Sequence, residues 1–332
     1  MSLMLQALQA VLPPNRKQTP SGWISFDAPC CHHRGETKDD RKRGGVMITG
    51  DAFTYHCFNC NFKAGWSPGK ILSHNTRKLF SWMGVPESEI THLAMEAVKA
   101  QDAIPRLKKE LSFELKEVEL PEAAMTITEW LNTPYLPDIA EDLGKVVDYV
   151  LSRGMALEWY DWMWSPAPGY IDRVIIPFYQ DYKLVGYTAR KITDGKPRYL
   201  AHSQPGYVFN LTRQPLGRKY TVVVEGHFDA IAIDGVCIGH NDPNETQIAR
   251  INTLNKEIIV VPDRDRAGSK MLKSAVDNGW SASLPPWGDD VKDVADAVKK
   301  YGRLYVLATI LHYRTDNKLK IQVMKKKLEG MG

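Results

Sequence analysis

The sequence predicts an α/β protein with more than one structural unit, and three observations carry that prediction. The chain has 332 residues, which at roughly 100–200 residues per domain corresponds to two or three domains. Four of its five cysteines lie within the first 60 residues. From residue 220 onward, short apolar runs alternate with helical patterns. The expected order is therefore a small β-rich, metal-binding unit followed by larger α+β and α/β units.

Composition places the chain among ordinary globular proteins. Hydrophobic residues make up 43% of the sequence and charged residues 25%, which excludes wholesale disorder and the collagen-like and coiled-coil classes. The longest apolar runs, such as Ile258–Pro262, are far too short to span a bilayer. Because no basic segment precedes the apolar residues near the N-terminus, we expect no signal peptide, no membrane partner and a cytoplasmic location.

Positive charge is concentrated in two stretches, although the formal net charge is only +4. Residues 171–221 contain nine Lys/Arg and three Asp, and residues 300–332 contain eight Lys/Arg and two Asp/Glu. Basic zones in a near-neutral chain favour a polyanion partner such as nucleic acid. Ordinary solvated faces are the alternative interpretation.

The clustered cysteines have the spacing of a metal site. Cys30-x-x-His33 and Cys57-x-x-Cys60 form two turns of equal spacing, and a tetrahedral zinc ion takes four such ligands. Because thiolate or imidazole fills every position, the predicted ion is a single structural zinc in a reducing compartment. Three neighbours are alternative ligands: Cys31, His32 and His56. Chance clustering of reduced cysteines is the remaining alternative.

Aromatic residues surround the second cysteine pair. They are Phe53, Tyr55, Phe58, Phe62 and Trp66. Such rings can stack on unpaired bases, or they can form the small core of a β-rich metal-binding unit. Both interpretations can hold for different rings. The tryptophan cluster at 159–164, in contrast, favours a core role over a base platform.

From residue 220 the pattern predicts a parallel sheet, because strands that alternate with helices form βαβ units. The expected strands are Thr221–Val224, Val236–Ile238, Glu257–Val261 and Trp280–Leu284. The expected helices are Phe228–Asp234, Glu245–Leu254, Ala267–Asn278 and Val291–Tyr301. Upstream, we expect a helix at Ile139–Arg153, and a hairpin of Arg173–Phe178 and Lys183–Thr188 that turns at Asp181 and Tyr182.

Carboxylates follow these strands directly. Glu225 comes after the first strand, Asp263 and Asp265 come after the third, and Asp293 follows the fourth. Because ligand sites of open parallel sheets lie at the carboxyl ends of the strands, these groups are expected to converge. Clustered carboxylates repel one another unless a cation neutralises them, and oxygen ligands favour Mg²⁺ or Mn²⁺. The sequence predicts a metal site suited to phosphoryl transfer, with helix N-capping as the alternative role.

Three groups of motifs resemble a known family. The runs Glu225-Gly-x-x-Asp229, Asp263-x-Asp265-x-x-Gly268 and Lys292-Asp293-x-x-Asp296 are similar to the TOPRIM domain of topoisomerases, primases and some nucleases. Cys57–Gly65, with Cys30-x-x-His33 upstream, resembles the zinc ribbon of bacterial and phage DNA primases. Three further segments resemble the basic subdomain of the same primases: Arg173–Pro177, Gly186–Arg190 and Lys196–Leu200. The layout is most similar to the single-polypeptide primases of large tailed phages.

The resemblance implies an architecture and a set of boundaries. A small β-rich zinc ribbon is followed by an α+β basic subdomain and a TOPRIM-type parallel α/β sheet. The expected divisions are a zinc-ribbon template-recognition domain at 1–75, a linker at 76–125, the basic subdomain at 126–218, the TOPRIM subdomain at 219–304 and a basic helical tail at 305–332.

The resemblance also implies an enzyme: a DNA primase, which synthesises short RNA primers on single-stranded DNA by metal-ion nucleotidyl transfer. It implies ribonucleoside triphosphates as substrates, a separate hexameric replicative helicase and a single-strand binding protein as partners, and the host-cell cytoplasm as the location of a phage-encoded chain. A TOPRIM-type DNA nuclease is one alternative. A non-catalytic, zinc-dependent protein that binds single strands and loads a helicase is the other.

Individual roles follow from the resemblance, residue by residue. The catalytic set is Glu225, Asp263 and Asp265, which with Asp293 would hold two or more Mg²⁺ or Mn²⁺ ions. Asp229 and Asp296 would orient these ligands. The zinc ligands would be Cys30, His33, Cys57 and Cys60. Nucleotide and template contacts fall to Arg173, Arg190, Lys196, Arg198 and Tyr199. Arg198 stands where the family usually has Lys, and Glu225 is left open between metal ligand and general base.

Overall fold

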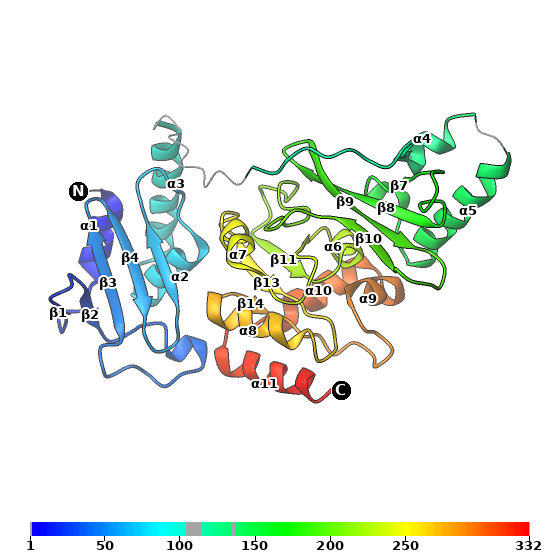
Figure 1. Ribbon diagram of the computed structural model, residues 1–332. Helices are drawn as coiled ribbons and strands as arrows, with labels where there is room; N and C mark the ends of the chain where they lie inside the picture. The colour runs from blue at the N-terminus through cyan, green and yellow to red at the C-terminus, as the bar shows by residue number, and fades with distance from the viewer. Residues whose placement is uncertain (1, 104–113, 135–136, 332) are drawn as a thin grey trace.

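The computed structural model describes residues 2–103, 114–134 and 137–331. Within these ranges the strands form three sheets, in the orders β1-β2-β3-β4-β5, β10-β9-β8-β7-β6 and β12-β11-β13-β14. The third sheet lies between the other two (Figure 1). Over the same residues, none of the helices combines the length and the apolar character that crossing a bilayer requires.

The first sheet belongs to the N-terminal unit, residues 2–103. Its elements are α1 (Leu3–Val11), β1 (Lys17–Gln18), β2 (Ile24–Phe26), η1 (His32–Arg34), β3 (Gly44–Thr49), β4 (Ala52–Cys57), β5 (Lys63–Trp66), α2 (His74–Trp82) and α3 (Glu87–Ala103). All neighbouring strands pair antiparallel. In β4 the buried residues are Phe53, Tyr55 and Cys57, because alternate side chains of a strand share one face. They join one apolar cluster with Leu8 and Phe80.

Helices α2 and α3 occupy residues that the sequence suggested as a linker. Ile90, Leu93 and Ala97 of α3 recur three to four positions apart and are buried in the cluster of the N-terminal unit, which is the pattern of an amphipathic helix. Residues 76–103 are therefore part of this unit. The polar residues between these positions concealed the apolar stripe. Residues 104–113 of the expected linker lie outside the described residues.

The second sheet forms the middle unit, which comprises the described residues between 114 and 218. Its elements are β6 (Met125–Thr126), α4 (Ile127–Leu131), α5 (Pro137–Ser152), η2 (Leu157–Trp159), β7 (Met163–Trp164), β8 (Arg173–Gln180), β9 (Lys183–Lys191) and β10 (Tyr199–His202). The predicted hairpin turns at Asp181 and Tyr182, with φ of 50° and 68°, as a two-residue turn that matches strand twist requires. Trp162 and Trp164 are fully buried, so this cluster is core.

The third sheet confirms the predicted parallel α/β arrangement. Its elements are β11 (Tyr220–Val224), α6 (His227–Ile233), β12 (Val236–Cys237), α7 (Glu245–Asn252), β13 (Glu257–Val260), α8 (Ser269–Asn278), β14 (Ser281–Ala282) and α9 (Val294–Tyr301). All three strand pairs are parallel. Val222, Val224 and Phe228 share one apolar cluster with Trp162 and Trp164 of the middle unit. We call residues 219–331 the parallel-sheet unit.

The last residues pack onto the parallel-sheet unit. Helix α10 (Arg303–Tyr313) buries Val306 and Ile310 in the core shared with the middle unit. Helix α11 (Lys318–Glu329) buries Ile321 and Leu328 in the cluster that contains α8, beside which it lies in Figure 1. The basic residues predicted a helical tail at 305–332. The structure instead gives two docked helices, because apolar residues at helical spacing alternate with the lysines.

Candidate metal centres

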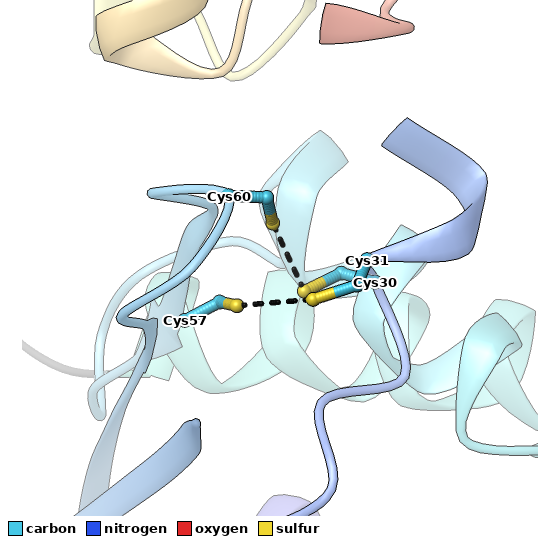
Figure 2. A group of neighbouring side chains, drawn as sticks. All are labelled: Cys30, Cys31, Cys57 and Cys60. Carbon is cyan, nitrogen blue, oxygen red and sulfur yellow. Dashed lines mark hydrogen bonds between the residues drawn. The ribbon is translucent and has the colours of Figure 1, made fainter. Parts of the chain in front are cut away.

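Four cysteine sulfurs form a compact group in the N-terminal unit. The Sγ atoms of Cys30, Cys31, Cys57 and Cys60 all lie within 4.8 Å of one another, and all four residues are buried. Two separations are 3.4 Å, from Cys30 to Cys60, and 3.5 Å, from Cys31 to Cys57 (Figure 2). A disulfide would be about 2.0 Å, whereas zinc–sulfur bonds of about 2.3 Å place tetrahedral sulfurs about 3.8 Å apart. The donor set therefore fits one structural zinc ion.

The ligand set differs from the predicted one at a single position. Cys31 joins the group, while the His33 ring stacks on Trp82 at a centroid distance of 5.0 Å and an interplanar angle of 9°. Adjacent cysteines both turn inward because the chain at Cys31 is helical, with φ of −59° and ψ of −53°, where it enters η1. Equal spacing of the two turns favoured His33. The presence of Cys31 was the signal in the sequence that pointed to the arrangement observed.

The protonation of these thiols explains why a cation belongs among them. Hydrogen bonds from Cys30 and Cys60 lower the pKa of Cys57 to about 2. Burial, in contrast, raises the pKa of Cys31 to about 12. Hydrogen bonding to Cys57 and Cys60 raises that of Cys30 further above its ordinary value. One thiolate therefore forms readily, and ionising the other thiols requires a compensating cation, because only thiolates ligate metal.

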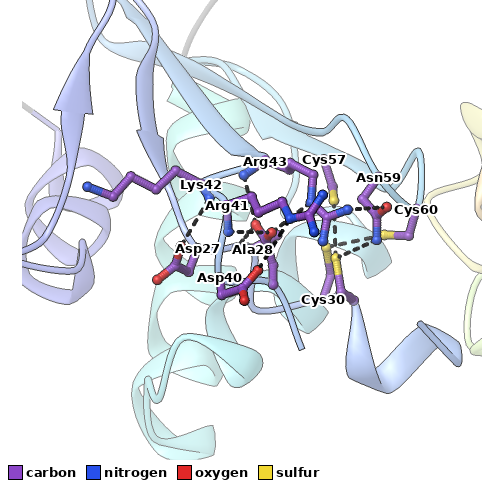
Figure 3. Close-up of polar contacts among 12 residues, drawn as sticks. Asp27, Ala28, Cys30, Asp40, Arg41, Lys42, Arg43, Cys57, Asn59 and Cys60 are labelled. Carbon is purple, nitrogen blue, oxygen red and sulfur yellow. Dashed lines mark hydrogen bonds and ion pairs between the residues drawn. The ribbon is translucent and has the colours of Figure 1, made fainter. Parts of the chain in front are cut away.

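A polar network that includes Arg43 and Asn59, both labelled in Figure 3, supports Cys31 from outside the sulfur group. Asn59 Nδ2 donates to Cys31 Sγ at 3.5 Å, and Arg43 Nη1 donates to Asn59 Oδ1 at 2.8 Å. The buried Asp39 accepts from Arg43 Nε at 2.7 Å and from the Ala28 amide at 2.8 Å. Burial pushes the pKa of Asp39 upward, but these donors outweigh it and hold the pKa below its ordinary value. Sequence reasoning missed this network. The Asp39/Arg43 spacing of four was the available signal.

Of the aromatic residues around the second cysteine pair, four form part of the core and one is exposed. Phe53, Tyr55, Phe62 and Trp66 are buried in the core of the N-terminal unit. Phe58 is 60% exposed. Its ring lies 4.4 Å from that of His56 and 5.9 Å from that of Trp23. Of the five rings, Phe58 is therefore the exposed one.

A second group of charged residues lies at the carboxyl edge of the parallel sheet. Glu225 follows β11, and its Oε1 accepts the backbone N–H of Asp263 at 3.2 Å. Asp265 Oδ1 accepts the N–H groups of Ala267 and Gly268 at 2.9 and 3.1 Å. A Cβ added at Gly268 would lie 2.3 Å from Asp263 O and 3.1 Å from Glu225 Oε1. Glycine is therefore what allows the loop of residues 263–268 to fold back on itself beside the Glu225 carboxylate.

Burial makes three carboxyl groups in this part of the fold weaker acids than usual. Burial raises the pKa of Glu225 to about 7. Burial, together with the charges of Glu225, Asp293 and Asp265, raises the pKa of Asp263 to about 7. Burial also raises that of Asp229 well above its ordinary value. A bound cation would reverse this balance, because a nearby positive charge favours the ionised form.

The acidic edge is less compact than the sulfur group. Among the described residues, only the four cysteines bring three or more ligand atoms within 4.8 Å of one another. The wider spacing suits Mg²⁺, which keeps several waters and binds through one or two carboxylates together with substrate phosphates. We call Glu225, Asp263, Asp265 and Asp293 the acidic edge.

The two acids expected to orient these ligands have different surroundings. Asp229 Oδ1 accepts the N–H of Ala295 at 2.8 Å, which ties α6 to the first turn of α9. Asp293 caps α9 by accepting the N–H of Asp296 at 2.7 Å. Asp296 itself faces Arg153 of the middle unit, with 3.8 Å between Oδ1 and Nη1. The N-capping role therefore holds for Asp293, and it leaves the second carboxylate oxygen of that residue outside the cap.

The predicted nucleotide-contact residues divide into buried and exposed groups. Arg173 is buried and donates to the carbonyls of Gly169 at 3.0 Å and Pro197 at 2.9 Å. Arg190 is also buried and bonds to the hydroxyls of Tyr149 and Tyr199. Lys196 and Arg198 are exposed, and Tyr199 is 44% exposed. The two arginines therefore shape this loop from inside, while the exposed residues are free to meet a ligand.

Comparisons with known proteins give partial matches to solved structures. No protein-family model matches the chain, and no curated protein matches its sequence. The RNA polymerase domain of Mycobacterium tuberculosis primase DnaG matches with 16% identity and a TM-score of 0.46, covering 57% of this chain and 85% of that one. The Aquifex aeolicus primase, with zinc-binding and RNA polymerase domains, matches with 16% identity and a TM-score of 0.43, covering 93% and 82%.

The Escherichia coli primase catalytic core also matches, with 16% identity and a TM-score of 0.44, over 60% of this chain and 81% of that one. Each likeness is partial in shape and low in identity. The function therefore has to be inferred from the residues of the two centres.

Proposed function

We propose that this chain is a DNA primase, which synthesises short RNA primers on single-stranded DNA by metal-dependent nucleotidyl transfer. The observation that carries the proposal is the convergence of Glu225 and Asp263 at the carboxyl edge of a parallel sheet, with the pKa of each raised to about 7. Such a pair calls for a divalent cation. The motifs around it are those that resemble the primase family.

Each residue of the acidic edge has a task in this proposal. Asp263, Asp265 and Asp293 would hold Mg²⁺ or Mn²⁺. When bound, the ions compensate the charge of the nucleoside triphosphate and make the attacking hydroxyl more acidic. Glu225, whose carboxylate lies against the backbone of Asp263, would either hold an ion as well or accept that proton as a general base. Lys196 and Arg198, exposed on the loop before β10, would neutralise phosphates.

The N-terminal unit would bind the template strand. Phe58 offers an exposed ring between the zinc ligands Cys57 and Cys60, and stacking on aromatic rings is a general way of holding unpaired bases. Partners of the proposed primase are single-stranded DNA, ribonucleoside triphosphates, a separate hexameric helicase and a single-strand binding protein. We further propose that the chain has the layout of the single-polypeptide phage primases and that it acts in the cytoplasm of the host cell.

A product-length assay tests the proposal. The zinc-loaded protein is incubated with single-stranded DNA of varied sequence, four ribonucleotides and Mg²⁺, with and without a cognate helicase. Short oligoribonucleotides that disappear in Asp263→Asn support a primase. Asp277→Asn is the matched control, because Asp277 is an acid of α8 paired with Lys273 at 2.6 Å. Shortened DNA would favour a nuclease instead. Binding without either product would favour the helicase-loading alternative.

A further inference from the structure

An arginine that belongs to none of the motifs lies in the middle of the acidic edge. Arg264 stands between Asp263 and Asp265, and its Nη1 donates to three backbone carbonyls of one turn. The separations are 2.7 Å to Trp287, 2.8 Å to Gly288 and 3.2 Å to Val291. Three carbonyls of the turn at 285–291 thus converge on a single guanidinium nitrogen.

A backbone hydrogen bond joins the same two loops. The N–H of Arg264 donates to the carbonyl of Lys292 at 2.9 Å, and Lys292 Nζ lies 3.7 Å from Asp265 Oδ2. Lys292 immediately precedes Asp293 in the sequence. The loop that carries Asp263 and the loop that carries Asp293 are therefore joined through Arg264 by both its backbone and its side chain.

The opposite side of the same turn is held by other groups. The Trp287 indole N–H donates to Thr309 at 3.1 Å, and the N–H of Gly288 donates to the hydroxyl of Tyr301 at 3.2 Å. Asp290 pairs with Lys300 at 2.6 Å. These contacts fix the turn to α9 and α10. None of them reaches the acidic edge, so the side chain of Arg264 makes the connection on that side.

We propose that Arg264 is a positioning residue, which holds Asp293 at a fixed separation from Asp263 and thereby sets the affinity of the acidic edge for divalent cations. The inference rests on the proposed function, because it concerns the same ions. Like-charged carboxylates push their loops apart, and a planar guanidinium can donate to several acceptors at once. A lysine in its place would keep the charge but lose the planar geometry.

The direction in which the cation affinity changes distinguishes a positioning role of Arg264 from a purely electrostatic one. By Coulomb's law, removing any positive charge near the acidic edge strengthens the binding of a cation. Loss of a positioning contact weakens it, and loss of such outer contacts typically lowers metal affinity about 10–100-fold. Arg264→Met should therefore weaken Mn²⁺ binding. Arg266→Met, in the same loop with an exposed side chain, should leave it unchanged or strengthen it.

The experiment is a Mn²⁺ titration of the zinc-loaded protein, followed by electron paramagnetic resonance of the free ion. We expect wild type and Arg266→Met to bind alike, Arg264→Lys to bind more weakly, and Arg264→Met to bind about 10–100-fold more weakly. Wild-type or tighter binding by Arg264→Met overturns the inference. Should that variant fail to fold, judged by circular dichroism and zinc content, wild-type affinity in Arg264→Lys overturns it instead.

A reference variant separates this inference from the proposed function. If Asp263→Asn binds Mn²⁺ as tightly as wild type, the acidic edge is not the ion site, and both proposals fall together. If Asp263→Asn loses the ion while Arg264→Met keeps it, only the positioning role is wrong. Primer synthesis by the same proteins then reports on the function independently.

Discussion

The two centres of this molecule are assembled in opposite ways. The sulfur group takes all four ligands from two turns of the N-terminal unit and buries them within 4.8 Å of one another. The acidic edge takes its carboxylates from loops that follow different strands, and it leaves them farther apart. The first arrangement is closed, as structural zinc sites are. The second is less compact, and in the proposed function waters and substrate oxygens would complete the ligands of its ions.

The residues around the two centres also differ. Around the sulfur group, Asn59, Arg43 and Asp39 form a chain of hydrogen bonds that ends on a ligand atom. At the acidic edge, burial raises the pKa of Glu225, and burial together with neighbouring charges raises that of Asp263, each to about 7. A permanent ion stabilises a fold, whereas a transient ion is suited to chemistry that begins and ends with each substrate.

The largest expected effect tests whether the sulfur group is the permanent site. Cys31→Ser should lose zinc and unfold the N-terminal unit, because structural zinc in small peptides contributes about 10–16 kcal/mol. His33→Ala is the matched control and should keep both the ion and the fold. Zinc content and the visible spectrum of the cobalt-substituted protein report the ligand set. If Cys31→Ser kept zinc and His33→Ala lost it, the ligand set would be the one predicted from spacing, with His33 in place of Cys31.

The next effect tests how tightly the acidic edge is built. Gly268→Ala places a methyl group 2.3 Å from Asp263 O and 3.1 Å from Glu225 Oε1, so the loop that carries Asp263 and Asp265 must change shape. Overpacking of this kind costs about 1–3 kcal/mol, and we expect primer synthesis to be lost while zinc is kept. Gly217→Ala, where a Cβ would meet nothing within 4 Å, is the control. Denaturant midpoints and product gels measure both quantities, and full synthesis by Gly268→Ala would show that the close approach is dispensable.

A pH series tests the buried carboxyl groups of the acidic edge. Burial raises the pKa of Glu225 from 4.5 and of Asp263 from 3.8, each to about 7. The folded chain therefore binds more protons than the unfolded chain across this range, and stability without added Mg²⁺ should fall as pH rises toward 7. Added Mg²⁺ should offset the loss. Thermal melts at several pH values measure this.

Glu225→Gln supplies the control for that series, because an amide cannot titrate. Its melting temperature should depend less on pH than that of wild type. Each group contributes at most about 1.4 kcal/mol per pH unit. A slope in Glu225→Gln equal to that of wild type would remove Glu225 as a source of the dependence.

The smallest expected effect concerns the network behind Cys31. Asn59→Ala removes one hydrogen bond to a ligand sulfur, which corresponds to about 1 kcal/mol, so zinc should stay bound but leave faster. Arg41→Ala is the control, because the side chain of Arg41 pairs with the exposed Asp40 at 3.8 Å, and the backbone N–H that Arg41 donates to Asp39 is kept in alanine. Transfer of zinc to a chromogenic chelator gives the rate. Equal release rates for Asn59→Ala and wild type would mean that the network does not reach the ion.

Sequence patterns predicted the parts of this molecule that depend on local periodicity. The four strands and four helices after residue 220 lie close to their expected positions, and the turn at Asp181 and Tyr182 is where its residues indicated. Helix α3 was missed because its buried stripe is interrupted by charged residues. The choice of Cys31 over His33 depends on the backbone conformation at the entry to η1, which spacing alone does not reveal.

The same limit applies to the candidate site residues. Strand ends placed Glu225 and Asp263 correctly at one edge, because parallel strands align their carboxyl ends. The burial of Arg173 and Arg190 depends on loop carbonyls and tyrosines that no motif includes. Arg264 was passed over for the same reason. Its partners at 287–291 lie on another loop, and only the folded chain brings them together.

The position of the sulfur group near the start of the chain has a consequence for biosynthesis. The N-terminal unit has its own apolar cluster, and its residues leave the ribosome long before the parallel-sheet unit is complete. Domains generally fold as units during synthesis, the N-terminal one first. In contrast, the ion pair between Lys78 and Asp316 joins residues that are 238 positions apart. A nascent chain can therefore acquire its zinc ion early, whereas the docking of this unit onto the turn before α11 has to wait until Asp316 has been translated.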